Sequence, residues 1–419
     1  MAKASVFIDG ESGTTGLGIR ERLAAQRGVE LRSLPAERRR DPAARKDMMA
    51  QVDLVILCLP DDAARESSAL ADSLGNAAPR LLDASTAHRV HPDWTYGFAE
   101  MLPGQADRIA ASRRVANPGS YPTGGIGLIR PLLDAGIIPS DYPITINAVS
   151  GYSGGGKAMI EAHEREGGPA FELYALGLEH KHVPETQLYG GLTRRPIFVP
   201  SVGHFSQGML VSVPLHLDTL TGRPSAADLH AVLAERYAGC DLVRVLPPSS
   251  DGKLEPEALN RTDRLELTVF ANEKYRQAVL VARLDNLGKG ASGAAVQNIG
   301  LMLGLHTGVG AREMADACRP ARPWRPPAAN RRSGPGRPYR RLRAGLLARR
   351  HHAENCSGRV HCPHRGGDRR RGDRLGDRHL VPLPGAGRHG VHPYRRAHQH
   401  PGRHGHPCRF RRLFHHHRR

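Results

Sequence analysis

The stretch Val115–Gly125, V-A-N-P-G-S-Y-P-T-G-G, places a serine where a nucleophile would be activated. Residues 117–119 form turns readily, and apolar residues repeat at helical spacing from Ile126 to Leu133. A side chain at position 120 would therefore face the positive end of a helix dipole, which favours the ionised form of a thiol or hydroxyl. We expect Ser120 to be a nucleophile. The alternative is that it only caps the helix, a position that serine favours.

The segment Asp9–Gly18, D-G-E-S-G-T-T-G-L-G, has the spacing of a phosphate-binding turn between a strand and a helix. It follows a short apolar run, Ser5–Ile8. Its glycines let the backbone approach a pyrophosphate, and the free N–H groups of the next helix can bind it. The alternative is an ordinary tight turn. The candidate cofactor-binding residues here are Gly10, Ser12, Gly13, Thr14, Thr15 and Gly16.

A basic cluster follows the second predicted strand, Val29–Leu34. An acidic residue at this strand end suits the ribose hydroxyls of NAD, whereas a basic cluster suits the 2′-phosphate of NADP. Ser33 and Arg38, with Arg39 and Arg40 beside them, are therefore predicted to bind NADP. The alternative for any single arginine is a place in a solvated loop.

Two further turns place polar residues at the ends of predicted strands, which face the ligand-binding crevice in a sheet of this kind. The strand Arg80–Ala84 leads into D-A-S-T-A-H-R, where Ser85 and Arg89 are candidates for substrate contact or for local capping. A second glycine-rich turn, Ser150–Lys157, either contacts the nicotinamide or a phosphate or only bends the chain. Its candidate contact residues are Ser153 and Gly154.

The order of elements that must position these residues predicts an α/β fold with two domains. In the first part, short apolar strands such as 53–59 alternate with helical patterns, which is typical of a Rossmann-type parallel sheet. Cys58 lies in this apolar run, where packing is expected rather than chemistry. From residue 144 to 285 the pattern changes to strands with few intervening helices, which indicates a mixed or antiparallel sheet. A small-residue helix is expected at 290–303. The predicted strands of the second sheet are 144–149, 197–200, 210–217, 242–246, 265–271 and 278–284.

The strongly basic composition belongs to one end of the chain. Residues 319–419 contain 27 Arg, no Lys and four acidic residues, which gives +23; since the whole chain carries +19, residues 1–318 carry −4. The sequence pI of about 10.3 therefore says nothing of nucleic-acid binding by the main body. Six cysteines, three in each part, predict neither a disulfide framework nor a metal site. Without an apolar run of about 20 residues or a signal peptide, we expect a cytoplasmic protein with no membrane association.

Residues 306–419 form a low-complexity basic tail that we expect to be disordered. Arginine without lysine over this length is typical of GC-rich coding sequence translated in another frame, with a frameshift near residues 306–320. The alternative is a tail selected to bind RNA or another polyanion, so a nucleic-acid partner is expected only if the tail is genuine.

Six ordered segments between residues 3 and 305 resemble the N-acetyl-gamma-glutamyl-phosphate reductases of arginine biosynthesis, specifically their shorter type. The matching segments are G-E-S-G-T-T-G, D-A-S-T-A-H-R, V-A-N-P-G-S-Y-P-T-G, S-G-Y-S-G-G-G-K, H-K-H-V-P-E and L-D-N-L-G-K-G-A-S-G-A-A-V-Q-N. The resemblance implies NADPH-dependent reduction of N-acetyl-glutamyl 5-phosphate to the semialdehyde, by a homo-oligomer of the semialdehyde-dehydrogenase type. It divides the chain into an NADP-binding domain at 1–116, a catalytic and dimerisation domain at 117–288, and a helix at 289–305 that returns to the first domain.

The resemblance also implies the roles of particular residues. The family has a nucleophilic cysteine at the position of Ser120, and a histidine as acid/base, for which His182 is the first candidate and His180 the second. Within the matching segments, the remaining candidates are Asn117 and Tyr121 for the substrate, beside Ser85 and Arg89, and Asn298 for the cofactor.

Serine at position 120 predicts binding with severely impaired turnover, because a hydroxyl is not ionised by surroundings that ionise a thiol of pKa about 8.5. Whether serine is engineered, natural or an error stays open. Two other functions also stay open: an inactive reductase-like scaffold whose basic tail binds polyanions, and an enzyme like aspartate-semialdehyde dehydrogenase.

Overall fold

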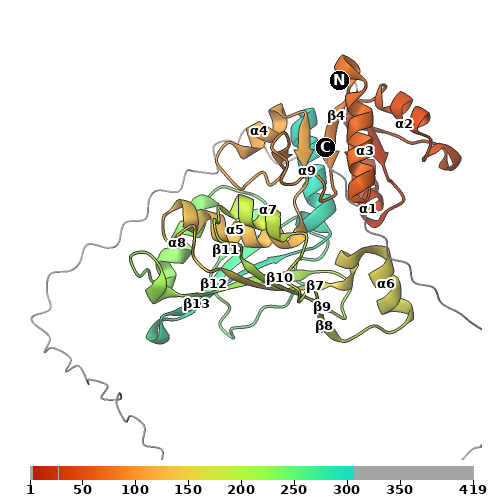
Figure 1. The fold of residues 1–419 in the computed structure, drawn as a ribbon. Helices are drawn as coiled ribbons and strands as arrows, with labels where there is room; N and C mark the ends of the chain where they lie inside the picture. Colours follow the sequence, from red (N-terminus) through yellow and green to blue (C-terminus); the bar gives the residue numbers. More distant parts are fainter. Residues whose placement is uncertain (1–2, 27, 306–419) are drawn as a thin grey trace, which may run out of the picture. The chain divides into compact units, whose positions relative to one another are not determined.

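The structure is a computed structural model that describes residues 3–26 and 28–305 (Figure 1). The predictions made for residues 306–419, namely disorder, a frameshift and polyanion binding, lie outside the described residues.

The first sheet has six parallel strands in the order β2-β1-β3-β4-β6-β5. Neighbouring strands align apolar residues in register, with Val6 opposite Leu54 and Ile56 opposite Leu82. Because both faces are buried, the central strand β3, L-V-I-L, is apolar throughout, as is usual for a parallel sheet. The strands are β1 (Ala4–Asp9), β2 (Val29–Arg32), β3 (Leu54–Leu57), β4 (Arg80–Asp83), β5 (Thr95–Tyr96) and β6 (Arg114–Ala116).

Successive residues of these strands enter two separate cores. Val6 and Ile8 pack on one side with α1 (Thr14–Ala24), α4 (Gln105–Ala111) and α9 (Gly293–Leu303). Phe7 packs on the other side with α2 (Pro42–Met49) and α3 (Asp61–Asp72). Helices therefore cover both faces of the sheet, and α9, which comes last in the described chain, lies beside α1 and α4 (Figure 1).

The second sheet has seven strands in the order β11-β12-β13-β10-β7-β9-β8 and is mixed. The pairs β11 with β12 and β7 with β9 are parallel, and the other neighbours are antiparallel. Burial alternates along β10, as expected for a sheet with one covered face. The strands are β7 (Thr145–Gly151), β8 (Phe171–Leu173), β9 (Ile197–Gly203), β10 (Met209–His216), β11 (Val243–Leu246), β12 (Leu265–Asn272) and β13 (Gln277–Leu284).

Three helices cover one face of this sheet: α5 (Ser120–Asp134), α7 (Val183–Gly190) and α8 (Ala226–Arg236) (Figure 1). Ile126 and Leu128 of α5 are buried in the shared core. Helix α6 (Gly156–Arg165) lies at the end of the sheet near β7. The opposite face carries the exposed side chains Phe171 and Leu173 beside an apolar hollow of about 630 Å³.

The α/β class, the Rossmann-type parallel sheet and the mixed second sheet agree with the sequence prediction. Three details differ: the amount of helix in the second half, the start of the last helix and the end of β3. The second half has more helix than expected, since α7 and α8 separate its strands. The small-residue helix at 290–303 begins as a π-turn at Gly288–Ser292 and becomes α-helical only at Gly293. A Cβ at Gly288 would lie 2.0 Å from the carbonyl oxygen of Thr262, so this wide turn depends on close backbone contact.

Strand β3 ends at Leu57, so Cys58 follows the strand instead of lying within it. Burial, followed by the nearby Asp83 and Asp9 carboxylates, raises the pKa of the Cys58 thiol to about 12. A thiol that stays protonated is a packing group, in agreement with the sequence interpretation. Among the described helices, none is long and apolar enough to cross a membrane.

Candidate active site

A cavity of about 320 Å³ lies where the ends of both sheets' elements meet. Helix α1, the turn before α5, the segment after β7, the loop before α7 and the π-turn all contribute to its lining. No metal-binding group of three or more His, Cys, Asp or Glu residues occurs in the part of the chain that the structure describes. The lining includes ten residues predicted from the sequence: Thr14, Thr15, Arg89, Asn117, Ser120, Tyr121, Ser153, Gly154, His180 and His182.

Ser120 is the first residue of α5, and the N-cap is Gly119, with no side-chain capping bond. The alternative that Ser120 serves as the N-cap is therefore wrong. Its Cβ lies so close to Gly290 that a Cβ added there would be only 2.7 Å away. The π-turn thus packs directly on position 120, which stands at the positive end of a 15-residue helix.

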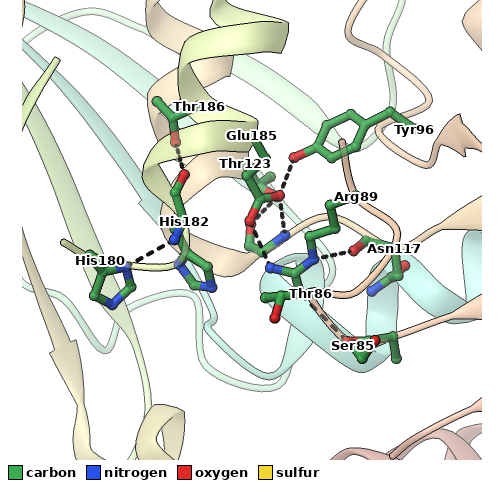
Figure 2. Close-up of polar contacts among 12 residues, drawn as sticks. Ser85, Thr86, Arg89, Tyr96, Asn117, Thr123, His180, His182, Glu185 and Thr186 are labelled. Atoms are coloured by element: carbon green, nitrogen blue, oxygen red, sulfur yellow. Dashed lines mark hydrogen bonds and ion pairs between the residues drawn. The ribbon is translucent and has the colours of Figure 1, made fainter. Parts of the chain in front are cut away.

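The turn before Ser120 is held by the buried carboxylate of Glu185, which is 1% exposed (Figure 2). Its Oε1 accepts a hydrogen bond from Nη1 of Arg89 at 2.7 Å. Its Oε2 accepts from the Tyr96 hydroxyl at 2.8 Å and from the Gly119 N–H at 3.2 Å. Glu185 therefore ties α7 to β5 and to the nucleophile turn. The sequence prediction missed it, although it follows the histidines in H-K-H-V-P-E.

Arg89 is fixed by several backbone and side-chain contacts. In addition to the Glu185 pair, its Nε donates to the carbonyl oxygen of Asn117 at 2.9 Å, and its Nη2 lies 3.5 Å from the carbonyl oxygen of Ala84. Both charges of the Arg89–Glu185 pair are buried, with side-chain exposures of 9% and 1%. The guanidinium thus has one orientation and a fully matched charge.

His180 and His182 lie side by side in the loop that leads into α7 (Figure 2). The backbone N–H of His182 donates to Nδ1 of His180 at 3.1 Å, so a neutral His180 carries its proton on Nε2, 3.5 Å from the Tyr174 hydroxyl. Burial, and then the charge of Lys181, lowers the pKa of His180 to about 4. Both causes leave this ring neutral at pH 7.

The pKa of His182 is also lowered well below its ordinary value, chiefly by burial and then by the charge of Arg89. Nδ1 of His182 is buried and has no hydrogen-bond partner among the described residues. A Cβ added to Gly119 would lie 2.9 Å from Nε2 of His182, so this nitrogen points at the turn before Ser120. Of the two rings, His182 is the one in contact with the nucleophile turn.

Asn117 and Asn298 form a hydrogen-bonded pair behind the cavity wall. Nδ2 of Asn298 donates to Oδ1 of Asn117 at 3.0 Å and to the carbonyl oxygen of Gly97 at 2.9 Å. Nδ2 of Asn117 donates to the carbonyl oxygen of Ala291 at 3.0 Å. Asn298 itself is fully buried and does not line the cavity.

Tyr121 lines the cavity, and its hydroxyl is already engaged in hydrogen bonds. The hydroxyl donates to the carbonyl oxygen of Ser201 at 3.1 Å, and burial raises its pKa. Ser85 also lies apart from the cavity, because its N–H and hydroxyl both bind the Asp83 carboxylate at 2.8 Å. Ser85 therefore caps a local turn in this structure.

The glycine-rich loop after β1 reaches the cavity only through Thr14 and Thr15. Gly10 has φ +91°, and a Cβ there would lie 2.3 Å from the carbonyl oxygen of Cys58. A Cβ at Gly16 would lie 2.6 Å from the carbonyl oxygen of Gly10. The predicted residues outside the cavity lining are Gly10, Ser12, Gly13, Gly16, Ser33, Arg38, Ser85 and Asn298.

The residues after β2 meet this loop at Glu11. The Ser33 hydroxyl donates to Oε2 of Glu11 at 2.8 Å, and Nη2 of Arg39 lies 2.6 Å from Oε1 of the same carboxylate. Arg20 also pairs with Glu11. Arg38 instead pairs with Asp41 at 3.4 Å. The sequence prediction named Arg39 only as a member of the basic cluster after β2. In the structure it is Arg39, and not Arg38, that contacts the glycine-rich loop.

Among the other lining residues, four have polar or charged side chains that the sequence prediction did not single out: Ser150, Tyr174, Lys181 and Asn286. Asn286 links two loops, since its Oδ1 accepts from the Gly208 N–H at 2.8 Å and its Nδ2 donates to the Ser153 hydroxyl at 2.9 Å. Asn286 lies in L-D-N-L-G-K-G, one of the segments that resemble the reductase family, and this position in the sequence could have indicated it.

Comparison of the sequence with known proteins shows the family to which the chain belongs. Residues 120–286 match the semialdehyde dehydrogenase dimerisation domain. N-acetyl-gamma-glutamyl-phosphate reductases of Brucella ovis and Brucella canis are 56% identical over 310 residues, which is 72% of this chain and 99% of each relative. The chain belongs to the N-acetyl-gamma-glutamyl-phosphate reductase family. More than a quarter of the chain has no counterpart in these reductases.

Solved structures of more distant proteins share the fold. Aspartate semialdehyde dehydrogenase II of Vibrio cholerae, in complex with ASA, aligns with a TM-score of 0.55 at 18% identity and covers 72% of this chain and 99% of its own. The Francisella tularensis aspartate semialdehyde dehydrogenase gives 0.55 at 13% identity, covering 71% and 99%. The family resemblance and the semialdehyde-dehydrogenase type of fold predicted from the sequence are both confirmed.

Proposed function

We propose that this protein binds NADPH and N-acetyl-glutamyl 5-phosphate and reduces the acyl phosphate to N-acetyl-glutamate 5-semialdehyde, with turnover strongly impaired by Ser120. One observation carries the proposal: position 120, at the start of α5, shares one cavity with His182 and Arg89. The 56% identity to reductases over 99% of their length favours this substrate. The likeness to aspartate semialdehyde dehydrogenases concerns the fold alone.

The reaction begins with attack by the side chain at position 120 on the acyl carbon. The bond between this carbon and the phosphate oxygen breaks, and its electron pair leaves with the phosphate. The first N–H groups of α5 have no partner within the helix and can stabilise the negative charge on the acyl oxygen. His182 accepts the proton of the attacking group. When the bond between the acyl carbon and the side chain at position 120 breaks and the aldehyde is released, His182 returns the proton to that side chain. Bound NADPH supplies the hydride for the acyl carbon.

His182 is the better candidate for acid/base catalysis than His180. Its Nε2 points at the nucleophile turn, and its pKa is lowered, so the ring is neutral and able to accept a proton at pH 7. His180 uses its Nδ1 to receive the backbone N–H of His182 and thereby orients the loop. We assign His180 a positioning role.

The cofactor fits the described residues. Thr14 and Thr15, at the N-terminus of α1, line the cavity, where they can bind a pyrophosphate. Gly13, the N-cap of α1, and Ser12 complete this turn. Ser33 and the arginines at 38 and 39 favour the 2′-phosphate of NADP, while Ser153 and Gly154 are assigned to the nicotinamide half. Asn298 is assigned an indirect part in cofactor binding, because it lies outside the cavity and holds Asn117 in its wall.

For the substrate we assign Arg89 the central role, because its rigid guanidinium lines the cavity and retains free N–H groups. Asn117 and Tyr121 complete the wall. Ser85 remains a weaker candidate, since its hydroxyl is engaged by Asp83.

The matched dimerisation domain supports a homo-oligomer. We propose that the uncovered face of the second sheet, with Phe171 and Leu173 exposed, pairs with a second copy. We also keep the division into a cofactor domain at 1–116, a catalytic domain at 117–288 and a returning helix at 289–305.

The test compares the unsubstituted chain with Ser120→Cys in NADPH oxidation by N-acetyl-glutamyl phosphate. We expect both proteins to bind NADPH, and the cysteine variant to turn over faster by a factor on the order of 10³, because the thiolate is accessible near neutral pH and the alkoxide is not. A folded Ser120→Cys variant that binds NADPH but stays inactive would overturn the proposal. Ser120→Ala is the matched control and should abolish any residual turnover.

A further inference from the structure

The π-turn at Gly288–Ser292, which packs on position 120 through Gly290, carries a lysine beside that glycine. Lys289 is only 1% exposed and lies outside the lining of the cavity. Its ammonium is therefore in the protein interior, where a charge is costly unless an opposite charge and hydrogen bonds match it. The groups that match it are those to which the π-turn is attached.

Three acceptor atoms match the three N–H donors of this ammonium. Nζ of Lys289 lies 2.8 Å from both Oε1 and Oε2 of Glu100, and 2.7 Å from Oε1 of Gln297. Gln297 in turn donates from Nε2 to Oε1 of Glu100 at 2.8 Å. The centroid of the Phe98 ring lies 5.7 Å from Nζ, within the range of a cation–π contact. The ammonium is thus fully matched and held from several sides.

Lys289, Glu100 and Gln297, which we call the Lys289 cluster, join parts of the chain that are far apart in sequence. Glu100 is also 1% exposed and lies between β5 and α4, while Gln297 lies on α9. Helices α4 and α9 both pack on the first sheet. Position 120, by contrast, begins α5, which covers the second sheet. The π-turn is therefore attached to the elements of the first sheet through Lys289 and touches the start of α5 through Gly290.

The contribution of this buried ion pair is geometric. A buried pair gives little or no stability beyond that of apolar side chains with the same volume, because removing both charges from water offsets their attraction. Three directed hydrogen bonds, however, restrict the ammonium to one position. Such a restriction matters in a π-turn, a rare form of backbone that occurs frequently at functional sites. Here the fixed position of Lys289 is passed to Gly290, the next residue, and so to position 120.

We propose that Lys289 is a positioning residue that clamps the π-turn against position 120 and so orients the nucleophilic side chain toward the acyl carbon. The inference rests on the proposed function, because the clamp acts on the group that attacks the substrate. Lys289 acts through the backbone of the turn. When the clamp is released, Gly290 can move away, and the side chain at position 120 becomes more accessible and takes up more orientations, fewer of which suit attack.

The experiment uses the full chain with Ser120→Cys as the parent and iodoacetamide as the probe. Peptide mass spectrometry follows alkylation at position 120 alone, so the other cysteines do not contribute. The rate is measured against pH, because its plateau reports access to the thiolate and its midpoint reports the ionisation of the thiol. The test variant combines Lys289→Met with Glu100→Gln, which removes both charges while keeping side chains of similar length.

In this double variant the alkylation plateau should rise about fivefold or more, through local opening of the turn, with the midpoint unchanged. The denaturation midpoint should lie above that of Lys289→Met alone, which strands the Glu100 carboxylate. In NADPH oxidation, kcat should fall about tenfold with KM within about threefold. A purely structural pair would instead change the denaturation midpoint and leave the alkylation of the folded protein as it is in the parent.

Arg283→Met with Glu266→Gln is the matched control, because this pair, at 2.6 Å between β12 and β13, is also largely buried and lies outside the cavity lining. Its plateau should equal that of the parent. Gln297→Leu is a milder variant that removes one acceptor of the ammonium, and its plateau should rise about twofold or more.

An unchanged plateau in the folded double variant, or an equal rise in the control pair, would overturn the assignment. If the double variant does not fold, an unchanged plateau in Gln297→Leu overturns it in the same way. Alkylation needs no turnover, so the two proposals fail separately. A raised plateau in a protein without reductase activity would support the clamp and contradict the proposed function, whereas an active parent with unchanged plateaus in both variants would do the reverse.

Discussion

Replacing Glu185 by glutamine should both destabilise the protein and disable the site. In the native protein its carboxylate accepts hydrogen bonds from Arg89, Tyr96 and the Gly119 N–H, at 2.7, 2.8 and 3.2 Å. Glutamine keeps the shape and one carbonyl acceptor but offers an NH₂ group where a donor is already present. It also leaves the Arg89 guanidinium buried without its counter-charge.

Breaking a buried ion pair by removing one partner costs about 3–5 kcal/mol, and the acceptor that glutamine keeps places Glu185→Gln near the lower end of this range. Chemical denaturation of the full chain, monitored by circular dichroism, measures this loss. In the Ser120→Cys background we also expect kcat to fall about 10²-fold, because the turn at Gly119 loses its anchor and a shift of about 1 Å in the nucleophile has that effect.

Glu185→Asp is a useful companion, because it keeps the charge but shortens the reach, and should recover part of the stability. A loss below about 1 kcal/mol in Glu185→Gln, with kcat unchanged, would refute the view that this carboxylate holds the nucleophile turn.

Two further predictions follow from the geometry and the ionisation of the site. Gly290→Ala should lower kcat in the Ser120→Cys background by at least about tenfold with a smaller effect on the Kd of NADPH, because the new Cβ would lie 2.7 Å from that of Ser120. Gly177→Ala is the control for glycine replacement, because a Cβ there would meet no atom within 4 Å. Equal kcat in the parent and in Gly290→Ala would contradict the packing. The pKa of His180 is about 4 in the folded protein against an ordinary 6.5, so the unfolded chain takes up the proton first and stability should fall as the pH drops from about 6.5 to about 4. The denaturation midpoint should fall less in His180→Gln than in the parent over this range. An identical fall in both proteins would contradict a neutral buried ring.

The fold was predictable where local pattern and tertiary role coincide. Strands β1 and β3 are short apolar runs followed by turn residues, and burial on both faces of the sheet requires this composition. Helices α4 and α7 are only seven and eight residues long, too short to show a helical repeat, so the sequence did not reveal them. Strand β8 has three exposed residues and pairs with β9 alone, so no alternation marked it.

The site was predictable where function requires an unusual local sequence. Ser120 stands out because a turn-forming segment leads directly into an apolar helix, and His182 because it belongs to a distinctive segment. Glu185 looks like an ordinary surface charge in the sequence. Its importance arises only when α7 packs beside Arg89 and places the carboxylate behind the cavity wall. For the same reason the sequence indicated a basic cluster after β2 but not that Arg39 contacts Glu11.

The central claim is that this chain has a reductase active site in which serine occupies the position of the nucleophile. The most direct measurement is the rate of NADPH oxidation with N-acetyl-glutamyl phosphate for the unsubstituted chain, Ser120→Cys, and Ser120→Cys combined with His182→Gln. We predict a rise on the order of 10³-fold on introducing the thiol, and a fall of about 10²-fold or more when His182 is then replaced. Equal rates in all three proteins, with NADPH bound and the fold intact, would contradict the account.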